Sequence, residues 1–225
     1  YTLSKTIEDL NQNSEIHGIL LQLPLPKHLN ANHHLAQITP QKDVDGFHPL
    51  NVGGLSLSLD VLAPCTPKGV IRLLNAYQIP LGGLNAVIVG RSNIVGRPIA
   101  QLLLQQNATV SVLHSSTKNM HEFTKNADLI VCATGIAKLI GPTHLGRGCH
   151  LIDVGINRLE DGSIVGDLDY DALRNHQFCA SITPVPGGVG PMTIAMLMEN
   201  CLLAYINQSK LEINALQELS NIRVN

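Results

Sequence analysis

The chain has 225 residues, of which 44% are hydrophobic and 14% charged, and its formal net charge is −2. That length accommodates one large or two small domains, and without a basic stripe or a long charge run the sequence offers no site for nucleic acid or an anionic membrane surface. The five cysteines form no Cys-x-x-Cys pair, so we expect reduced thiols in a cytoplasmic or organellar-matrix protein. The longest apolar runs, such as residues 84–89, are too short to cross a bilayer, and we expect no membrane partner.

The first quarter of the chain predicts short, mixed elements. Residues 2–12 place Leu and Ile at helical spacing and predict a helix. The apolar run HGILLQLPLP, residues 17–26, predicts a buried strand that its prolines end. Residues 30–40 predict a short helix, and residues 41–55, which include the segment KDVDGF, predict a loop.

From residue 66 onward, predicted strands and helices alternate. The pattern predicts a helix at 66–78, a strand, tight turn and helix within 85–106, strands at 108–114, 128–135 and 149–156, and a helix at 118–127. Nearly continuous apolar strands that alternate with helices are typical of a parallel sheet buried on both faces, so the predicted fold class is α/β. Residues 191–208 predict a last helix that is apolar nearly all round and therefore buried.

The segment VIVGRSNIVGRP, residues 87–98, is the clearest local signal. Gly90 follows a strand and precedes a helix, a geometry that aims free backbone N–H groups at an anion, usually a pyrophosphate. The spacing departs from the dinucleotide-binding fingerprint, because Ser92 holds the place of the second glycine and Gly96 comes one residue late. Taken alone, the segment is equally compatible with a structural turn.

The next strand indicates which dinucleotide would bind. It ends in HSST, residues 114–117, where an NAD-preferring site usually has a carboxylate for the ribose hydroxyls. Arg91 and Ser115 could instead bind a 2′-phosphate through a charged donor and a hydroxyl. The residues therefore favour NADP over NAD.

Other polar residues have two readings each. Asp43 and Asp45 do not form a calcium loop, because the twelfth position from Asp43 is Gly54 where a bidentate Glu is needed, so they are turn formers or site groups. Gln22 interrupts an apolar run and is either a core amide or a site group.

The ten histidines form no metal-binding pair, and we predict no metal site.

The segment ITPVPGGVGPMT, residues 182–193, is too rich in proline and glycine to continue a helix or strand. One interpretation is a sharp turn before the last helix, and the other is a backbone surface shaped for a flat ligand.

Seven motifs occur in order between about residues 18 and 206: LLQLPLP, KDVDGFHPLNVG, PCTPKG, VGRSNIVGRP, CATG, DVGINR and ITPVPGGVGPMT. This set closely resembles the bifunctional methylenetetrahydrofolate dehydrogenase/methenyltetrahydrofolate cyclohydrolase family. The resemblance implies two α/β domains with the active-site cleft between them. The expected folate domain comprises residues 1–65 plus 191–225, and the expected Rossmann-like NADP domain comprises residues 66–190. It also implies a homodimer formed through the cofactor domain.

The resemblance implies two linked reactions. Hydride passes from 5,10-methylenetetrahydrofolate to NADP, and water then converts the methenyl product to 10-formyltetrahydrofolate. Asp45 matches the family aspartate that hydrogen-bonds the pterin, and Gln22 matches the glutamine that orients the catalytic lysine. The remaining implied substrate-binding positions are Leu21, Leu23, Pro186, Gly187, Gly188, Val189 and Gly190. The implied cofactor-binding positions are Gly90, Arg91, Ser92, Ser115 and Ile156.

One departure from the family pattern concerns the catalytic lysine. In the family it lies in a Tyr-x-x-x-Lys segment upstream of the helix that opens this chain, and Lys5 matches it poorly and should face the surface. We expect the sequence to be a fragment without that segment. The alternatives are a monofunctional dehydrogenase of the same family and a catalytically inactive dinucleotide-binding module, although the latter would need neither Gln22 nor Asp45. An unrelated dehydrogenase would share the glycine turn but not the folate motifs.

Overall fold

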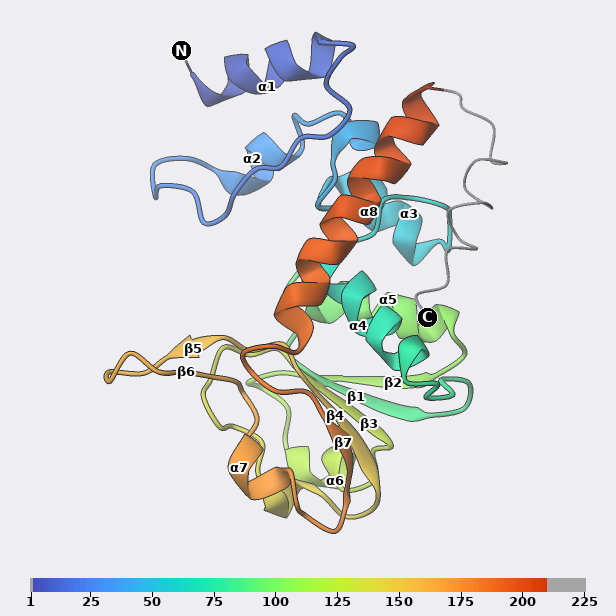
Figure 1. Cartoon of the computed structure of the whole chain (residues 1–225), viewed down its shortest axis with the longest axis vertical. Coiled ribbons are helices and arrows are strands. Elements are labelled where there is room, and N and C mark those ends of the chain that lie inside the picture. Colours follow the sequence, from blue (N-terminus) through green and yellow to red (C-terminus); the bar gives the residue numbers. More distant parts are fainter. Residues whose placement is uncertain (1, 210–225) are drawn as a thin grey trace.

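The computed structural model describes residues 2–209 and contains a five-stranded parallel sheet (Figure 1). The strand order is β2-β1-β3-β4-β7, and every neighbouring pair is parallel. The strands are β1 (Asn85–Val89), β2 (Thr109–Leu113), β3 (Leu129–Cys132), β4 (Cys149–Asp153) and β7 (Cys179–Ile182). The predicted α/β class and its strands at 108–114, 128–135 and 149–156 are confirmed, with shorter bounds. Tyr1 and the predicted domain segment 210–225 lie outside the described residues.

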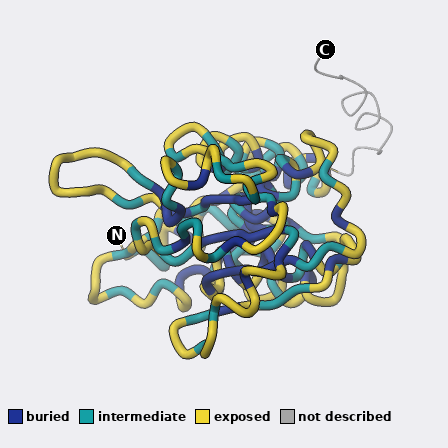
Figure 2. Tube along the Cα trace, turned by 90° about the horizontal axis from the view of Figure 1, so that it is seen from below, coloured by how far each residue is buried: buried dark blue, intermediate teal, exposed yellow. Residues whose placement is uncertain are grey.

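Both faces of the sheet are covered by helices, and Figure 2 shows that the buried residues gather at the centre of the molecule. Alternating side chains of β1 reach opposite cores: Ile88 packs with Val70 and Leu103, whereas Val87 packs with Leu173. One face is covered by α4 (Cys65–Ala76) and α5 (Gly96–Gln105), and the other by α6 (Met120–Thr124) and α7 (Tyr170–Leu173) (Figure 1).

The first segment of the chain forms short helices rather than a sheet. These are α1 (Leu3–Gln12), α2 (Ala31–Leu35), η1 (Pro40–Lys42) and α3 (Pro49–Ser56). The predicted buried strand at 17–26 is wrong: only Ile19 pairs, in a single bridge to Asp43, and Gln22 is exposed. An apolar run becomes a strand only where a neighbour satisfies its backbone groups, and among the described residues this run has one such partner.

The prediction of a loop over residues 41–55 is also wrong in its second half, because α3 forms there. Gly53 and Gly54 lower the helix propensity of the segment. The start of the helix is nevertheless well defined: His48 accepts a hydrogen bond from the Leu50 backbone N–H through Nδ1, and Pro49 occupies the first turn. The prediction of a loop did not take this cap into account.

The last helix, α8 (Val189–Ser209), runs from the sheet to the first segment (Figure 1). It packs against α4 and η1. The prediction that it is buried nearly all round is wrong, because one side carries the exposed apolar residues Ile194, Met198, Leu202 and Tyr205. Within residues 2–209, α8 is also the one helix that is long and apolar enough, by length and composition, to span a bilayer. Its buried Asn200 and ion-paired Glu199 are contacts typical of a helix packed within a folded protein.

Several short elements were not predicted. They are η2 (Pro142–His144), the antiparallel pair β5 (Asn157–Arg158) and β6 (Ile164–Val165), α7 and β7. Each is at most four residues long, which is too short for a repeating pattern of apolar and polar residues to reveal a helix or strand.

Candidate active site

A cavity of about 380 Å³ lies at the carboxyl ends of β1, β2 and β3, where nucleotides bind in open parallel sheets. We refer to it as the cofactor cavity. It gathers four of the five predicted cofactor-binding residues, Gly90, Arg91, Ser92 and Ser115. The other lining residues are Val89, His114, Met120, Ala133, Thr134, Ile136 and Leu139. The fifth predicted residue, Ile156, does not line this cavity, and its side chain is 69% exposed.

The predicted tight turn is present between β1 and α5. Gly90 has φ +123°, a conformation that L side chains rarely adopt, and a Cβ there would collide with the Ala133 carbonyl. A Cβ at Gly96 would collide with the Gly90 carbonyl, so the late glycine allows the start of α5 to approach the turn. Ser92 closes the turn, because its Oγ accepts hydrogen bonds from the N–H groups of Val95 (3.2 Å) and Gly96 (3.3 Å).

The charges around the cofactor cavity suit a dinucleotide with an additional phosphate. None of its lining residues is Asp or Glu, and within residues 2–209 Arg91 forms no ion pair. The guanidinium group of Arg91 is thus available to an anion, and Ser115 adds a hydroxyl. The residues present therefore fit NADP.

Two buried aspartates that the sequence analysis did not single out hold the loops on the other side of this cavity. Asp167 accepts hydrogen bonds at Oδ2 from the N–H groups of Thr134 (2.6 Å) and Gly135 (3.0 Å), and at Oδ1 from Asn157 Nδ2 (2.9 Å). Asp153 accepts at Oδ1 from the Asp167 N–H (2.9 Å), and burial raises the pKa of its carboxyl to about 6. Because Thr134 lines the cavity, these carboxylates fix part of its wall. Asp153 belongs to the DVGINR motif, but nothing in the sequence indicated its partners.

The two aspartates of the KDVDGF loop have different surroundings. Asp43 is fully buried, and its Oδ2 accepts hydrogen bonds from the His48 N–H (2.7 Å) and Asn51 Nδ2 (2.8 Å). Its Oδ1 is buried without a partner among the described residues. Asp45 is half-buried, and desolvation together with the charge of Asp43 raises the pKa of its carboxyl to about 6. Asp43 is therefore a structural group, while Asp45 is the more accessible carboxylate.

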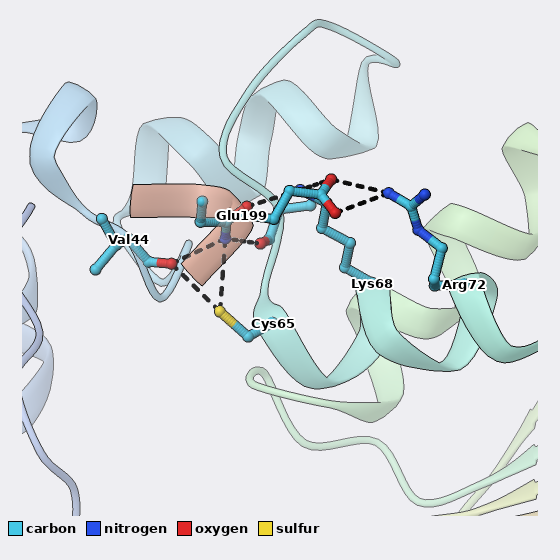
Figure 3. A network of polar contacts seen from close by, with 7 residues as sticks. Val44, Cys65, Lys68, Arg72 and Glu199 are labelled. Atoms are coloured by element: carbon cyan, nitrogen blue, oxygen red, sulfur yellow. Dashed lines mark hydrogen bonds and ion pairs between the residues drawn. The ribbon is translucent and has the colours of Figure 1, made fainter. Parts of the chain in front are cut away.

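A network of polar contacts fixes the loop that carries Asp45 (Figure 3). Asn200 of α8 is fully buried, and its Nδ2 donates to the carbonyls of Val44 (2.8 Å) and Ala63 (2.9 Å). Its Oδ1 accepts from Lys68 Nζ (2.9 Å), which also binds Glu199 at 2.9 Å. Because Val44 directly precedes Asp45, α8 holds the position of the predicted pterin-binding residue.

Gln22 is not the buried amide that its apolar neighbours suggested. It is exposed, and its Nε2 donates to the carbonyl of Leu23 at 2.9 Å, while Leu21 and Leu23 are half-buried. Lys5 faces the surface as predicted and pairs with Glu8 and Asp9.

Two other lysines near the loop are engaged in the structure. Lys42 is buried, and its Nζ donates to the carbonyls of Leu10, Asn11 and Asn13 at 3.1, 2.7 and 2.8 Å. Lys68 is occupied by Asn200 and Glu199, as described above. Neither ammonium group is free to act beside Gln22.

The segment from Pro186 to Gly190 leads into α8, as one interpretation of its prolines and glycines required. Gly187 and Gly188 line a cavity of about 260 Å³ beside α4, and Val189 is buried in the core of the sheet. Residue 189 and Asn200, the anchor of the Asp45 loop, are separated along α8 by about 16 Å at the rise of an α-helix. Helix α8 therefore begins within one predicted substrate-binding segment and anchors the loop that carries Asp45.

Family models match two parts of the chain. The model described as the tetrahydrofolate dehydrogenase/cyclohydrolase NAD(P)-binding domain matches residues 64–209, and the catalytic-domain model of the same name matches residues 1–45. The bifunctional protein FolD of Campylobacter concisus is 57% identical over 198 residues, which is 88% of this chain and 69% of that protein. FolD of Brevibacillus brevis is 48% identical over 204 residues, 91% of this chain and 71% of that protein.

Solved structures show the same likeness. The methylenetetrahydrofolate dehydrogenase/cyclohydrolase FolD of Campylobacter jejuni has a TM-score of 0.89 at 52% identity, covering 92% of this chain and 73% of that one. The Trypanosoma brucei enzyme, complexed with NADP cofactor and an inhibitor, has a TM-score of 0.86 at 35% identity, covering 93% and 73% of the two chains.

Proposed function

Because the chain belongs to the tetrahydrofolate dehydrogenase/cyclohydrolase family, we propose that one cleft built around Asp45, Gln22 and residues 186–190 serves both of the family's reactions. The chain is a bifunctional NADP-dependent methylenetetrahydrofolate dehydrogenase and methenyltetrahydrofolate cyclohydrolase. NADP, when bound, supplies the acceptor for the hydride. The residues of the chain bind and orient the folate and manage the proton of the attacking water.

The observation that carries the site assignment is the environment of Asp45. The aminopyrimidine edge of a pterin offers two adjacent N–H donors, which a carboxylate binds with both oxygens. Asp45 is half-buried, on a loop fixed by Asn200, and at neutral pH its raised pKa of about 6 still leaves it mostly ionised. Such a carboxylate has already lost much of its hydration and gains from two charge-assisted donors.

The other predicted residues take roles around this anchor. We assign Gln22 to orienting the group that handles the proton of the attacking water, with Leu21 and Leu23 as apolar contacts of the folate. The segment 186–190 forms the opposite wall, and Gly90, Arg91, Ser92, Ser115 and Ile156 bind the cofactor. We divide the chain accordingly into a folate domain, residues 1–65 plus 191–225, and an NADP domain, residues 66–190.

Substitutions at Gln22 and Asp45 test this assignment in the full-length protein. Hydride transfer depends chiefly on placing the methylene carbon against the nicotinamide, whereas hydrolysis also needs proton management. Gln22→Ala should therefore lower cyclohydrolase turnover more than dehydrogenase turnover, and Asp45→Ala should cripple both. Formation of NADPH and decay of the methenyl substrate are followed by stopped-flow absorbance, with the exposed Gln12→Ala as control. Equal losses in the two activities for Gln22→Ala would contradict its role.

We also propose that the cytoplasmic enzyme is a homodimer joined through its cofactor domains. Strand β7 supports this contact, because it is the last strand of the sheet and within the described residues only β4 pairs with it. An unpaired strand edge is a ready template for a second chain. Sedimentation velocity should give the mass of a dimer, and the exposed substitution Ala180→Lys at this edge should shift it towards the monomer. A wild-type protein of monomer mass would exclude the contact.

A further inference from the structure

A second cavity adjoins the cofactor cavity and has no role in the assignment above. Its volume is about 440 Å³, and we call it the α3 cavity because Val52, Leu55 and Ser56 of that helix line one side. Arg91 and His114 line both cavities, so the two spaces meet at these side chains. The α3 cavity therefore begins at the end of β2, the place where the ribose of a dinucleotide lies in this type of fold.

Two guanidinium groups face the α3 cavity and nothing in the described chain neutralises them. Arg91 and Arg97 both line it, and none of the lining residues is Asp or Glu. Three other exposed arginines of residues 2–209 are ion-paired: Arg72 binds Glu199, Arg147 binds Asp128 and Arg174 binds Asp171. Arg158, which lies away from the cavity lining, is also exposed without an ion pair in this part of the chain. Arg91 and Arg97 have no such partner in the same part of the chain. Two like charges on one small cavity favour an anion between them.

The α3 residues that line the cavity are tied to α5 by a hydrogen bond. Gln105 of α5 donates from Nε2 to the carbonyl of Leu55 at 2.7 Å, which fastens the end of α3 to the helix that carries Arg97. Ser56 Oγ donates to the carbonyl of Val52 at 3.2 Å, so this hydroxyl remains within its helix. The recognition of charge in the α3 cavity thus falls on Arg91 and Arg97 rather than on α3.

We propose that Arg97 is a second determinant of cofactor specificity, which binds the 2′-phosphate of NADP together with Arg91 at the mouth of the α3 cavity. This inference rests on the proposed assignment of the cofactor cavity. A phosphate monoester carries close to two negative charges at neutral pH, so one arginine leaves it partly unneutralised and two match its charge. The sequence analysis treated Arg97 only as part of a glycine-rich turn.

Calorimetric titration with 2′,5′-ADP and with 5′-ADP isolates this contact from catalysis, because the two probes differ only in the 2′-phosphate. Arg97→Ala should lower the affinity for 2′,5′-ADP by about tenfold and change that for 5′-ADP by less than about twofold. Arg97→Gln, which keeps the first methylene groups of the side chain and a polar end but removes the charge, should show the same selectivity. Arg174→Ala, an exposed arginine on α7's C-terminal cap, serves as the matched control and should change neither affinity.

Two results would overturn the inference. Equal losses for both probes would place Arg97 at the pyrophosphate or in the fold of the turn, and unchanged affinities would leave it outside the site. The wild-type protein separates this from the assignment of the cofactor cavity: if it binds 2′,5′-ADP no better than 5′-ADP, the proposed role of Arg91 fails as well. If Arg91→Ala lowers the affinity for 2′,5′-ADP and Arg97→Ala does not, only the proposed role of Arg97 is refuted.

Discussion

At the scale of single residues, the two aspartates of the KDVDGF loop show how function opposes stability in this protein. Asp43 accepts two hydrogen bonds at Oδ2, from the His48 N–H and from Asn51 of α3, whereas Asp45 is partly desolvated beside it. A half-buried carboxylate next to another one destabilises the folded state when it is ionised. A ligand that donates hydrogen bonds to Asp45 removes this cost, so the folded state without ligand is less stable than its packing would allow.

The substitution Asp45→Asn tests whether the ionised carboxylate of Asp45 lowers the stability of the folded protein. The folded-state pKa of about 6 lies above the ordinary value of 3.8, so between about pH 4 and pH 6 the folded protein binds more protons than the unfolded one. The contribution of Asp45 to stability therefore falls as the pH rises through this window. Asn carries no charge, so the variant should be more stable than wild type by about 1–3 kcal/mol at neutral pH, with the difference vanishing near pH 4.

Urea unfolding of both proteins at several pH values measures the effect, and the dehydrogenase activity of the variant should be lost at the same time. Asp153 also has a raised pKa but is present in both proteins, so its titration cancels in the difference. A stability difference that does not change with pH would show that the carboxylate of Asp45 is not desolvated.

At the scale of elements, buried polar side chains reinforce contacts between segments that only small hydrophobic clusters join. Lys42 caps the C-terminal end of α1, where the last carbonyls of a helix have no partner of their own. Its ammonium group also complements the negative end of the helix dipole. One side chain thus fixes α1 against η1.

Replacing Lys42 by Met should destabilise the protein by about 3–5 kcal/mol, because the apolar stem is kept while three carbonyl acceptors lose their buried, charged donor. Chemical denaturation gives the free energy of unfolding. The control is Lys5→Met on the surface of the same helix, whose exposed ion pairs contribute at most about 1 kcal/mol. Comparable effects of the two substitutions would argue against a structural role for Lys42.

Asn200 performs the corresponding role between α8 and the loop of Asp45. In Asn200→Asp, the side chain keeps the acceptor for Lys68 but cannot donate to the Val44 and Ala63 carbonyls. A carboxylate oxygen then faces these two carbonyl oxygens in a buried site without a hydrogen between them. We expect a loss of about 2–4 kcal/mol in stability and a weaker binding of folate, seen as a raised KM. Unfolding and steady-state kinetics measure these, with the exposed Asn75→Asp of α4 as control. An unchanged KM would mean that Asn200 supports the fold without positioning Asp45.

At the scale of the whole molecule, the sequence predicted what depends on local pattern. Strands β1, β2, β3 and β4 are short, mainly apolar runs, and the turn at Gly90 has a recognisable chemistry, so these were found, whereas the fifth strand, β7, was not. The segment 17–26 looked like those strands, but its state depends on a pairing partner that its own residues do not specify. The partners of Asp167 and Asn200 come from distant positions, and no spacing within a motif encodes them. That Arg91 and Arg97 line the same cavity likewise became visible only in the folded structure.

The position of α8 near the end of the described chain also determines the order in which parts of the protein can fold during translation. The bond from Asn200 to Val44 joins residues 156 positions apart, and at ribosomal rates this interval lasts roughly 8–30 s. All five strands of the sheet have been synthesised once residue 182 is made, before most of α8 exists. The nascent chain therefore has the complete sheet first, while the loop of Asp45 waits for its anchor. The loop of Asp45 is thus synthesised early, but it reaches its final position only after Asn200 has been made.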